Sequence, residues 1–441
     1  MQKDTSLPPT TLVIFGITGD LSRRYILPAL TALDQSGHLP ASFKLLGLSR
    51  GPITPEEVLP AKAKCLGRYL HTRQMDMAKP QDYAELKSAL DPAAHTIFYF
   101  AVPPAAVLPI VRNMGQAGLN GPNIKLLLEK PFGVDLESAG ELITQTQEYF
   151  SEDQLYRIDH YLAKGMTQNI AVFLSSNALV RNVWSNQFID YIEIVVAEKI
   201  DIEGRAAFYE HTGALRDMVQ SHLLQLAALT LMEPCPDPFD FTDLPQRRYK
   251  ALSQLVPPTP DKLATQAIRA QYMGYAQEVG NPDSTAETFV ALQLTSQSPR
   301  WAGVPIYLAT GKNLDERLSQ IRVNFKKINN SEANQLVIRI QPEEGIEVDI
   351  WARQPGYRDE LQKKALSFSY QQDFDGRIPD AYEQVLFDAM RSRSNLFASS
   401  AEVLETWRIL QPVINHWAMA GNKIHIYKPG SSVEQILEKN S

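Results

Sequence analysis

Cysteine is scarce in this sequence. Its 441 residues include only Cys65 and Cys235, whose spacing matches no metal-binding motif. A secreted protein of this size commonly contains more cysteine, because disulfides form and persist in oxidising compartments. The scarcity therefore favours two reduced, structural thiols and a cytoplasmic location.

Long apolar segments are also absent. Residues 1–10 are polar and include Pro8 and Pro9, and the run Leu12–Phe15 is far too short for the core of a signal peptide. No segment approaches the roughly 18 apolar residues that a membrane-spanning helix requires. We expect neither a secretory leader nor a membrane partner.

The chain has no excess of basic residues. Its formal net charge is −7, and its lysines and arginines are scattered, so the sequence shows no electrostatic footprint for DNA or RNA. A mildly acidic protein that binds an anion must gather a few cationic side chains in a local pocket. We therefore expect a small-molecule partner rather than nucleic acid, and we follow individual Lys, Arg and His positions.

The rest of the composition is that of an ordinary globular protein. Hydrophobic residues make up 44% of the chain and charged residues 21%, with no internal repeat or low-complexity tract. A chain of this length exceeds what a single hydrophobic core usually serves. The sequence therefore predicts two domains.

Residues 1–160 alternate between strand and helix patterns. A buried strand at 12–15 leads through a tight turn at 16–20 into a helix at 21–33, whose Leu21, Leu27, Leu30 and Leu33 share one side. Further strand patterns lie at 43–48, 96–101 and 124–128. Such alternation favours a doubly wound, Rossmann-like parallel sheet over residues 1–160.

The pattern changes after residue 160. Long amphipathic helices are expected at 161–185 and 213–233, and a proline-rich stretch at 234–260 looks like a connector. Strand patterns then follow one another without intervening helices, at 190–197, 288–295, 304–309, 318–325 and 336–341. We expect residues 161–441 to form an α+β domain with a large, mainly antiparallel sheet.

The turn after the first strand carries the first candidate site. Its small residues allow the backbone to approach a pyrophosphate, and the helix that follows favours negative charge at its N-terminus. It lacks the usual three-glycine fingerprint, so a tight turn without a ligand is the alternative. The candidate residues are Gly16, Thr18, Gly19, Asp20 and Leu21.

Arg50 follows the second strand of this pattern. NAD-binding folds usually place an acidic residue there to bind the ribose hydroxyls, whereas an arginine suits the 2′-phosphate of NADP. Arginine is also a common surface residue, so a solvated cation is the alternative interpretation.

The run 157–164 places His160 and Lys164 four residues apart. On a helix the two side chains would point to one spot and could clamp a phosphate. A simple pair on a helix surface, with Asp159 as its N-cap, is the alternative.

The segment 213–225 is similarly ambiguous, because it predicts a helix with a polar stripe in an apolar surround. His222 lies on that stripe and could act as a base. A lone helical histidine is nevertheless often structural, and periodicity does not separate the two roles.

Taken together, the motifs resemble the glucose-6-phosphate dehydrogenase family. The resemblance covers nearly the whole chain and is carried by the Gly-x-x-Gly-Asp-Leu turn, by Glu129-Lys130-Pro131-Phe132-Gly133 and by the run 157–164. It continues through Trp301-Ala302-Gly303-Val304-Pro305 and Thr310-Gly311-Lys312. The family has a Rossmann-like domain followed by an α+β domain whose sheet commonly forms a dimer interface, so a homodimer or homotetramer is implied.

The resemblance also implies a reaction without a metal. His222 would remove the proton of the C1 hydroxyl of glucose 6-phosphate while hydride passes to NADP, with NAD as a possible substitute, and Asp159 would orient the histidine. The implied substrate residues are His160, Tyr161, Lys164, Glu198, Asp217, Lys312, Arg317 and Lys130. The implied cofactor residues are Gly16, Thr18, Gly19, Asp20, Leu21, Arg50, Pro103, Lys130 and Pro131, with a cis peptide possible before Pro131.

Several positions depart from the family pattern. Tyr25 replaces a lysine that normally reaches toward the substrate, and Asp201, Gly165 and Ala309 also replace the usual residues. The chain is shorter than usual between Arg50 and Ala101. Two alternatives therefore stay open: a dehydrogenase of another phosphorylated aldose, and a catalytically silent relative that binds nucleotide or sugar phosphate.

Overall fold

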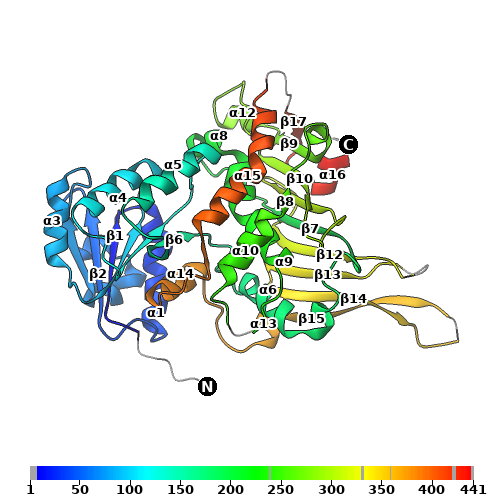
Figure 1. The fold of residues 1–441 in the computed structure, drawn as a ribbon, viewed down its shortest axis with the longest axis horizontal. Coiled ribbons are helices and arrows are strands. Elements are labelled where there is room, and N and C mark those ends of the chain that lie inside the picture. Colours follow the sequence, from blue (N-terminus) through cyan, green and yellow to red (C-terminus); the bar gives the residue numbers. More distant parts are fainter. Residues whose placement is uncertain (1–6, 238–239, 329–331, 358, 420–423, 439–441) are drawn as a thin grey trace. The chain divides into compact units, whose positions relative to one another are not determined.

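The computed structural model describes residues 7–237, 240–328, 332–357, 359–419 and 424–438. The chain divides into two compact units. The first consists of Met1–Lys164 and Pro379–Val403, and the second of Gly165–Ile378 and Leu404–Ser441. Each unit is built around its own sheet (Figure 1).

The sheet of the first unit has the strand order β16-β6-β5-β4-β1-β2-β3. All of its neighbouring strands are parallel except β16, which pairs antiparallel with β6. This is the order of a doubly wound dinucleotide-binding sheet, and it confirms the Rossmann-like prediction. The strands are β1 (Thr10–Phe15), β2 (Phe43–Ser49), β3 (Leu70–Gln74), β4 (His95–Phe100), β5 (Ile124–Leu128), β6 (Leu155–Ile158) and β16 (Phe397–Ala398).

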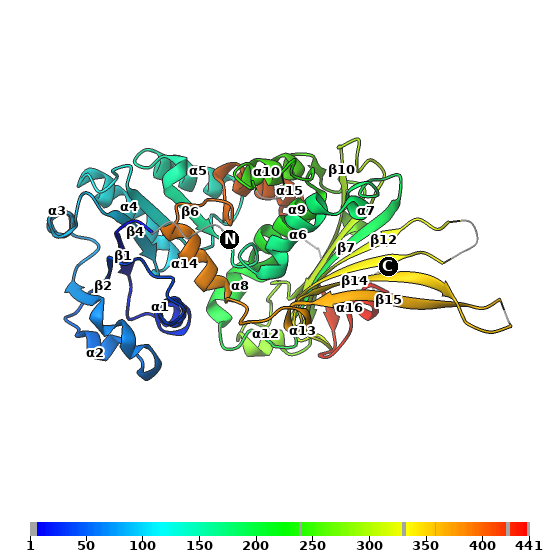
Figure 2. The same cartoon turned by 90° about the horizontal axis from the view of Figure 1, so that it is seen from below.

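The central strands of this sheet are buried on both faces. Every residue of β1, β4 and β5 is buried, as expected for parallel strands covered by helices on both sides. Figure 2 shows α4 and α5 on one side of the blue and cyan strands and α1 on the other. The helices are η1 (Ser22–Ile26, π-helical), α1 (Leu27–Gln35), α2 (Pro55–Val58), η2 (Ala61–Arg68), α3 (Pro80–Ala89), η3 (Pro104–Ala106), α4 (Val107–Gln116), α5 (Leu136–Gln147), η4 (Glu152–Gln154) and α14 (Ala381–Met390).

A late segment of the chain completes the first unit. Helix α14 packs against α1, and its Val385 and Leu386 join the same apolar cluster as Leu27 and Leu30. Strand β16 then extends the sheet beside β6. Residues 379–403 thus contribute both to the core and to the edge of the nucleotide-binding unit.

The second unit contains a ten-stranded sheet. Its order is β15-β14-β13-β12-β7-β11-β10-β9-β17, with β8 paired to β10, and only the β7–β11 and β9–β17 pairs are parallel. The mainly antiparallel sheet is therefore confirmed. Its strands are β7 (Ile189–Ala197), β8 (Leu255–Val256), β9 (Ala267–Tyr272), β10 (Phe289–Ser296), β11 (Ile306–Gly311), β12 (Leu318–Phe325), β13 (Gln335–Gln341), β14 (Gly345–Arg353), β15 (Leu361–Ser369) and β17 (His425–Tyr427).

Helices of the second unit gather beside this sheet, as Figure 2 shows for α6 and α9. Helix α9 is buried along its whole length, which its run of leucine and alanine explains. None of the described helices is long and apolar enough to cross a membrane. The helices are α6 (Gly165–Ser176), α7 (Ala178–Arg181), α8 (Ala206–Ala214), η5 (Leu215–Leu223, π-helical), α9 (Leu224–Leu231), α10 (Leu244–Ser253), α11 (Leu263–Gln266), α12 (Tyr275–Glu278), α13 (Tyr370–Asp373), α15 (Ser400–Trp417, which starts in the first unit) and α16 (Val433–Glu438).

Two expectations about local structure are wrong, and a third is right in extent but not in hydrogen-bonding pattern. The helix expected at 161–185 begins only at Gly165, because residues 159–164 form turns closed by hydrogen bonds between residues i and i+3, and it ends at Ser176 before the short α7. The helix expected at 213–233 is confirmed over 215–231, but its first part, η5, is π-helical and only α9 is α-helical. The supposed connector at 234–260 contains α10, whose Pro245 lies in the first turn, where a proline is compatible with a helix.

Candidate active site

In the first unit, the candidate residues follow the carboxyl ends of neighbouring parallel strands. Gly16 follows β1, Arg50 follows β2, Lys130 follows β5, and Asp159 follows β6, while Pro103 comes shortly after β4. Parallel strands end at the same edge of a sheet, and ligands of this fold bind in the crevice at that edge, where the strand order reverses. Here the order reverses between β1 and β4.

The turn after β1 has no room for a side chain at its first glycine. Gly16 has φ +83°, and a Cβ there would lie 2.3 Å from the carbonyl oxygen of Ala101. The turn is closed by the Gly19 amide, which donates to the Gly16 carbonyl at 2.9 Å, and Thr18 is exposed. Its bare, tightly closed backbone fits the close approach of a pyrophosphate.

Arg50 lies where the expected 2′-phosphate site would be. It is exposed directly after β2, and its carbonyl accepts a hydrogen bond from Gln74 at 3.0 Å. The preceding Ser49 donates its hydroxyl hydrogen bond to the Gly51 carbonyl at 2.6 Å, which fixes the bend. The backbone of Arg50 is thus fixed at this bend, while its side chain is exposed to solvent.

The segment after β5 contains a buried carboxyl group that sequence reasoning did not assign. The hydroxyl of Tyr99 donates to Glu129 Oε1 at 2.5 Å. Burial raises the pKa of Glu129 to about 7, although the Tyr99 hydrogen bond and Lys130 lower it. The peptide bond between Lys130 and Pro131 is cis, as the family resemblance suggested. Glu129 thus anchors the loop that presents Lys130.

The run 159–164 is organised by turns rather than by a helix. The carboxylate of Asp159 accepts a hydrogen bond from the Tyr161 amide at 2.9 Å, and the Lys164 amide donates to the Tyr161 carbonyl at 3.2 Å. The Lys164 ammonium lies 3.8 Å from the centre of the Tyr161 ring. The prediction that a helix positions His160 and Lys164 is therefore wrong. Tyr161 and Lys164, however, are in contact.

In the second unit, the parallel pair β7 and β11 brings two candidates together. Ala197 and Gly311 are paired at the ends of these strands, so Glu198 and Lys312 follow side by side. The Lys312 ammonium, only 2% exposed, forms an ion pair with Glu198 at 2.7 Å. Arg317 is exposed and directly precedes β12, whose first residue, Leu318, pairs with Ala197.

Asp217 and His222 are both buried on η5. In an α-helix, residues five positions apart point about 140° away from each other. In a π-helix the hydrogen bond joins residues i and i+5, so such residues share a face. The Leu224 amide donates to the Val219 carbonyl in this way. The π-helix therefore puts Asp217 and His222 on one face, and η5 packs against β7 and β11.

Tyr209, which the sequence analysis did not single out, connects these candidates. Its ring centre lies 5.4 Å from the Lys312 ammonium. Burial raises the pKa of the Tyr209 hydroxyl well above its ordinary value, and Asp217 and Glu198 add to that rise. Asp217, Glu198 and Lys312 thus surround one tyrosine.

The departures from the family pattern occupy different environments. Tyr25 is 42% exposed and stacks on Tyr382 with 5.1 Å between ring centres. Ala309 is buried in β11 and lines a cavity of about 270 Å³ beside α16. Asp201 is exposed and accepts from the Glu203 amide at 2.7 Å. Gly165 starts α6, where the Glu344 carboxylate accepts from the next amide at 2.6 Å.

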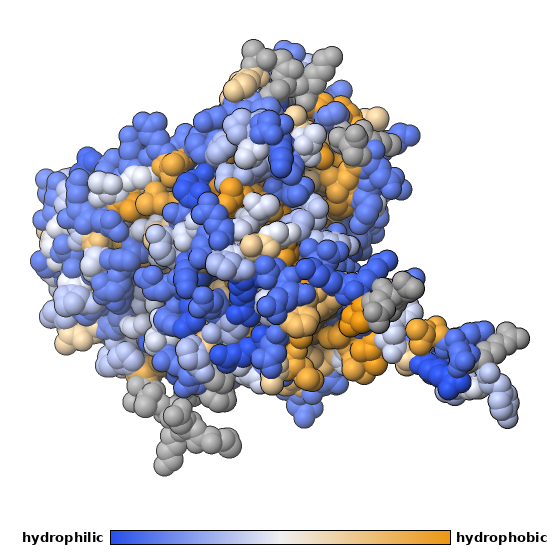
Figure 3. Space-filling model, turned by 45° about the vertical axis from the view of Figure 1, so that its right-hand side comes forward, coloured by the Kyte–Doolittle hydropathy of each residue, from blue (hydrophilic) through white to orange (hydrophobic). Residues whose placement is uncertain are grey.

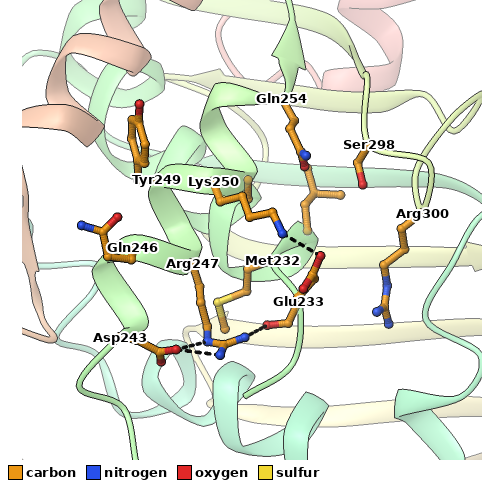
Figure 4. Close-up of a pocket in the computed structure, with 12 residues that line it drawn as sticks. Met232, Glu233, Asp243, Gln246, Arg247, Tyr249, Lys250, Gln254, Ser298 and Arg300 are labelled. Carbon is orange, nitrogen blue, oxygen red and sulfur yellow. Dashed lines mark hydrogen bonds and ion pairs between the residues drawn. The ribbon is translucent and has the colours of Figure 1, made fainter. Parts of the chain in front are cut away.

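Another cavity, of about 400 Å³, lies beside α10 in the second unit (Figure 4). Two of its basic side chains have acidic partners: Arg247 pairs with Asp243 at 2.6 Å, and Lys250 pairs with Glu233 at 2.9 Å. A further one, Arg300, donates to the main-chain carbonyl of Trp184 at 2.6 Å. Because each of these cations already has an acceptor, we do not assign a phosphate to this cavity.

Models of two protein families match the chain almost end to end. The model described as glucose-6-phosphate dehydrogenase, NAD binding domain, matches residues 13–169. The model described as glucose-6-phosphate dehydrogenase, C-terminal domain, matches residues 171–439.

Curated relatives agree with these family models. The chain is 34% identical over 465 residues to glucose-6-phosphate 1-dehydrogenase of Chlamydia muridarum, with 93% of this chain and 91% of the relative covered. It is 35% identical over 461 residues to the enzyme of the same name from Aggregatibacter actinomycetemcomitans, with 95% and 93% covered.

Solved structures give the same result. A glucose-6-phosphate dehydrogenase in complex with its substrate glucose-6-phosphate has a TM-score of 0.90 at 29% identity, with 99% of both chains covered. Glucose-6-phosphate 1-dehydrogenase from Mycobacterium avium has a TM-score of 0.87 at 31% identity, with 99% of this chain and 97% of that chain covered. Matches to both domains and over the full length show that the chain belongs to the glucose-6-phosphate dehydrogenase family.

Proposed function

We propose that this protein oxidises the C1 hydroxyl of glucose 6-phosphate to 6-phosphogluconolactone and transfers the hydride to NADP. One observation carries the proposal: the chain matches both family models over nearly its whole length and contains His222, Asp159 and the run 157–164, to which the family resemblance assigns the base, its carboxylate partner and the phosphate contacts. The structure of a relative is described as a complex with glucose-6-phosphate as its substrate.

The proposed chemistry needs a base and an acceptor. His222 accepts the proton of the C1 hydroxyl as the C1–O bond becomes a carbonyl and the C1–H bond breaks. A bound nicotinamide supplies the site that receives the hydride. Asp159 orients the imidazole and stabilises the imidazolium that forms.

The remaining candidates would bind the sugar phosphate. We assign the 6-phosphate to His160, Tyr161 and Lys164, because cationic and hydroxyl donors form strong hydrogen bonds with phosphate oxygens. Glu198 and Asp217 would accept from the sugar hydroxyls. The remaining contacts in this proposal are Lys312 and Arg317 beside the substrate and Lys130 between the substrate and the cofactor.

NADP rather than NAD is the proposed acceptor, because a guanidinium at position 50 can pair with a 2′-phosphate. We expect Arg50→Ala to lower kcat/KM for NADP by about 10- to 100-fold, the loss of one charge-assisted contact, while kcat/KM for NAD changes little. Steady-state assays with both nucleotides check this. The exposed Lys44 of the same strand provides the control variant Lys44→Ala, and equal losses with both nucleotides would contradict the assignment.

NADPH formation at 340 nm tests the proposed function itself. Glucose 6-phosphate should be compared with free glucose, galactose 6-phosphate and glucosamine 6-phosphate. Turnover with glucose 6-phosphate well above the others supports the proposal. Turnover with another aldose phosphate would make Tyr25, stacked on Tyr382 in place of the family lysine, the first candidate for changed specificity. No turnover with any sugar phosphate would favour a silent relative.

Self-association through the sheet of the second unit is the proposed assembly, as a homodimer or a homotetramer. Exposed apolar side chains on and after β15 include Leu361, Leu366 and Phe374. Figure 3 shows orange surface near the base of the protruding hairpin and along it. Exposed apolar surface of this kind commonly marks an interface. Light scattering would detect a multiple of the 49.5 kDa chain mass.

The cytoplasmic location stays a prediction.

A further inference from the structure

Glu287 precedes β10 and contacts the start of the helix that carries Asp217 and His222. Its carboxylate Oε1 accepts a hydrogen bond from the Leu215 amide at 2.9 Å. Its main-chain carbonyl accepts from the Ala214 amide at 2.8 Å. Glu287, which is only 6% exposed, therefore accepts hydrogen bonds from two successive amides where η5 begins. Amides in the first turn of a helix have no partner within that helix, so this contact satisfies groups that would otherwise be buried without one.

The backbone of Gly213 lies so close to this carboxylate that it leaves no space for a side chain. Gly213 has φ +63°, in the left-handed region that favours glycine. A Cβ at this position would lie 2.3 Å from Glu287 Oε1. The chain therefore bends sharply between α8 and η5 against the carboxylate.

This contact lies at the start of η5, where the hydrogen-bonding pattern of the helix begins. A π-helix is rare and usually short, because the α-helical hydrogen-bonding pattern competes with it. Only the π-helical pattern puts Asp217 and His222 on one face, as described above. When the first turn of η5 is held in place, the directions in which the later side chains of η5 point are fixed as well.

We propose that Glu287 is a positioning residue for the reaction. Glu287 fixes the first turn of η5, and the first turn in turn fixes the orientation of His222. Glu287 does not have to contact His222 for this effect. This inference rests on the proposed role of His222 as the base. A displacement of about 1 Å in a catalytic group can cost on the order of 100-fold in rate, so the orientation of η5 is expected to affect kcat more than substrate affinity.

A neighbouring cavity makes the proposal testable without loss of the fold. A cavity of about 210 Å³ is lined by Glu287, Arg216, Arg269 and Trp417, among others. If the carboxylate is removed, water from this cavity can accept from the Leu215 amide. The amide would then be satisfied, but by a mobile partner.

The test compares three substitutions at position 287. We expect Glu287→Ala to lower kcat by about 10- to 100-fold, with the KM values for sugar phosphate and nucleotide within about threefold of the parent. Glu287→Gln keeps an oxygen that can accept from Leu215 and should restore most of kcat. Glu287→Asp is one methylene shorter and should give an intermediate kcat, which keeps the proposal testable if the alanine variant does not fold.

Glu210→Ala is the matched control. The Glu210 carboxylate accepts from Tyr275, Asn281 and Ser284 in the same region but makes no described hydrogen bond to η5. We expect this variant to lose thermal stability while kcat stays near the parent value. An equal loss of kcat in Glu210→Ala and Glu287→Ala would overturn the positioning role, and so would an unchanged kcat in Glu287→Ala or a loss confined to KM.

Hydrogen–deuterium exchange separates this inference from the proposed function. Amides of residues 214–219 should exchange faster in Glu287→Ala than in the parent and should be protected again in Glu287→Gln. If the parent oxidises no sugar phosphate, the proposed function fails, while this measurement still tests the anchor. Unchanged exchange in Glu287→Ala would overturn the anchor whatever the activity.

Discussion

Replacement of His222 by asparagine is expected to lower kcat for glucose 6-phosphate by about 10²- to 10⁴-fold, the range that a general base contributes. Asparagine has a similar size and keeps hydrogen-bonding groups, but it cannot take up the hydroxyl proton at neutral pH. Because His222 is only 1% exposed, a smaller residue would also leave a cavity, and asparagine keeps that effect small.

Steady-state kinetics and substrate binding by calorimetry check this prediction. Binding of glucose 6-phosphate should stay within a few-fold of the parent, because the proton is transferred only in the transition state. The exposed His425 of the same unit provides the control variant His425→Asn. If His222→Asn keeps its turnover, another group must be the base.

Replacement of Lys164 by alanine is expected to raise KM for glucose 6-phosphate by about 10- to 100-fold with little change in kcat. Removal of one charge-assisted hydrogen bond to a phosphate costs about 1.5–3 kcal/mol, and the phosphate is bound equally in the ground state and the transition state. Lys164 is half-buried against Tyr161, so its ammonium is held in place before the substrate arrives.

Kinetics with glucose 6-phosphate and with free glucose distinguish the phosphate contact from a general defect. The variant should lose affinity for the phosphorylated sugar while its weak use of free glucose stays unchanged. Lys164→Arg should recover part of the loss, and Lys62→Ala, at an exposed lysine of the same unit, should have no effect. A fall in kcat with an unchanged KM would place Lys164 outside the phosphate site.

The four central strands of the nucleotide-binding unit could be predicted. Three of them, β1, β4 and β5, are buried along their whole length, and helix patterns separate them in the sequence, which is typical of a parallel sheet covered on both faces. The edge strand β3 could not be predicted, because its sequence is mostly polar. The turn at Gly16 and the position of Arg50 followed from local order along the chain. The return of residues 379–403 to this unit could not be predicted, because α14 and β16 have no local signal for the partner on which they pack.

The family motifs could be located in the sequence, but their local geometry could not be predicted from it. Helical spacing suggested that His160 and Lys164 would converge, whereas turns around Asp159 and Tyr161 organise this segment. In the second helical segment, an α-helical period would have separated Asp217 from His222. The choice of a π-helix depends on contacts such as the one between Leu215 and Glu287, which are 72 residues apart.

The sequence by itself determined the two sheets, the order of the motifs and the residue types at the candidate site. These features depend on period, composition and neighbours along the chain, which are local properties. Tertiary structure alone decided that Glu198 pairs with Lys312, that Glu287 meets the start of η5 and that loss of water raises the pKa of Glu129. Such features depend on which distant strands become neighbours and on which charges lose water, and both are settled only when the chain packs.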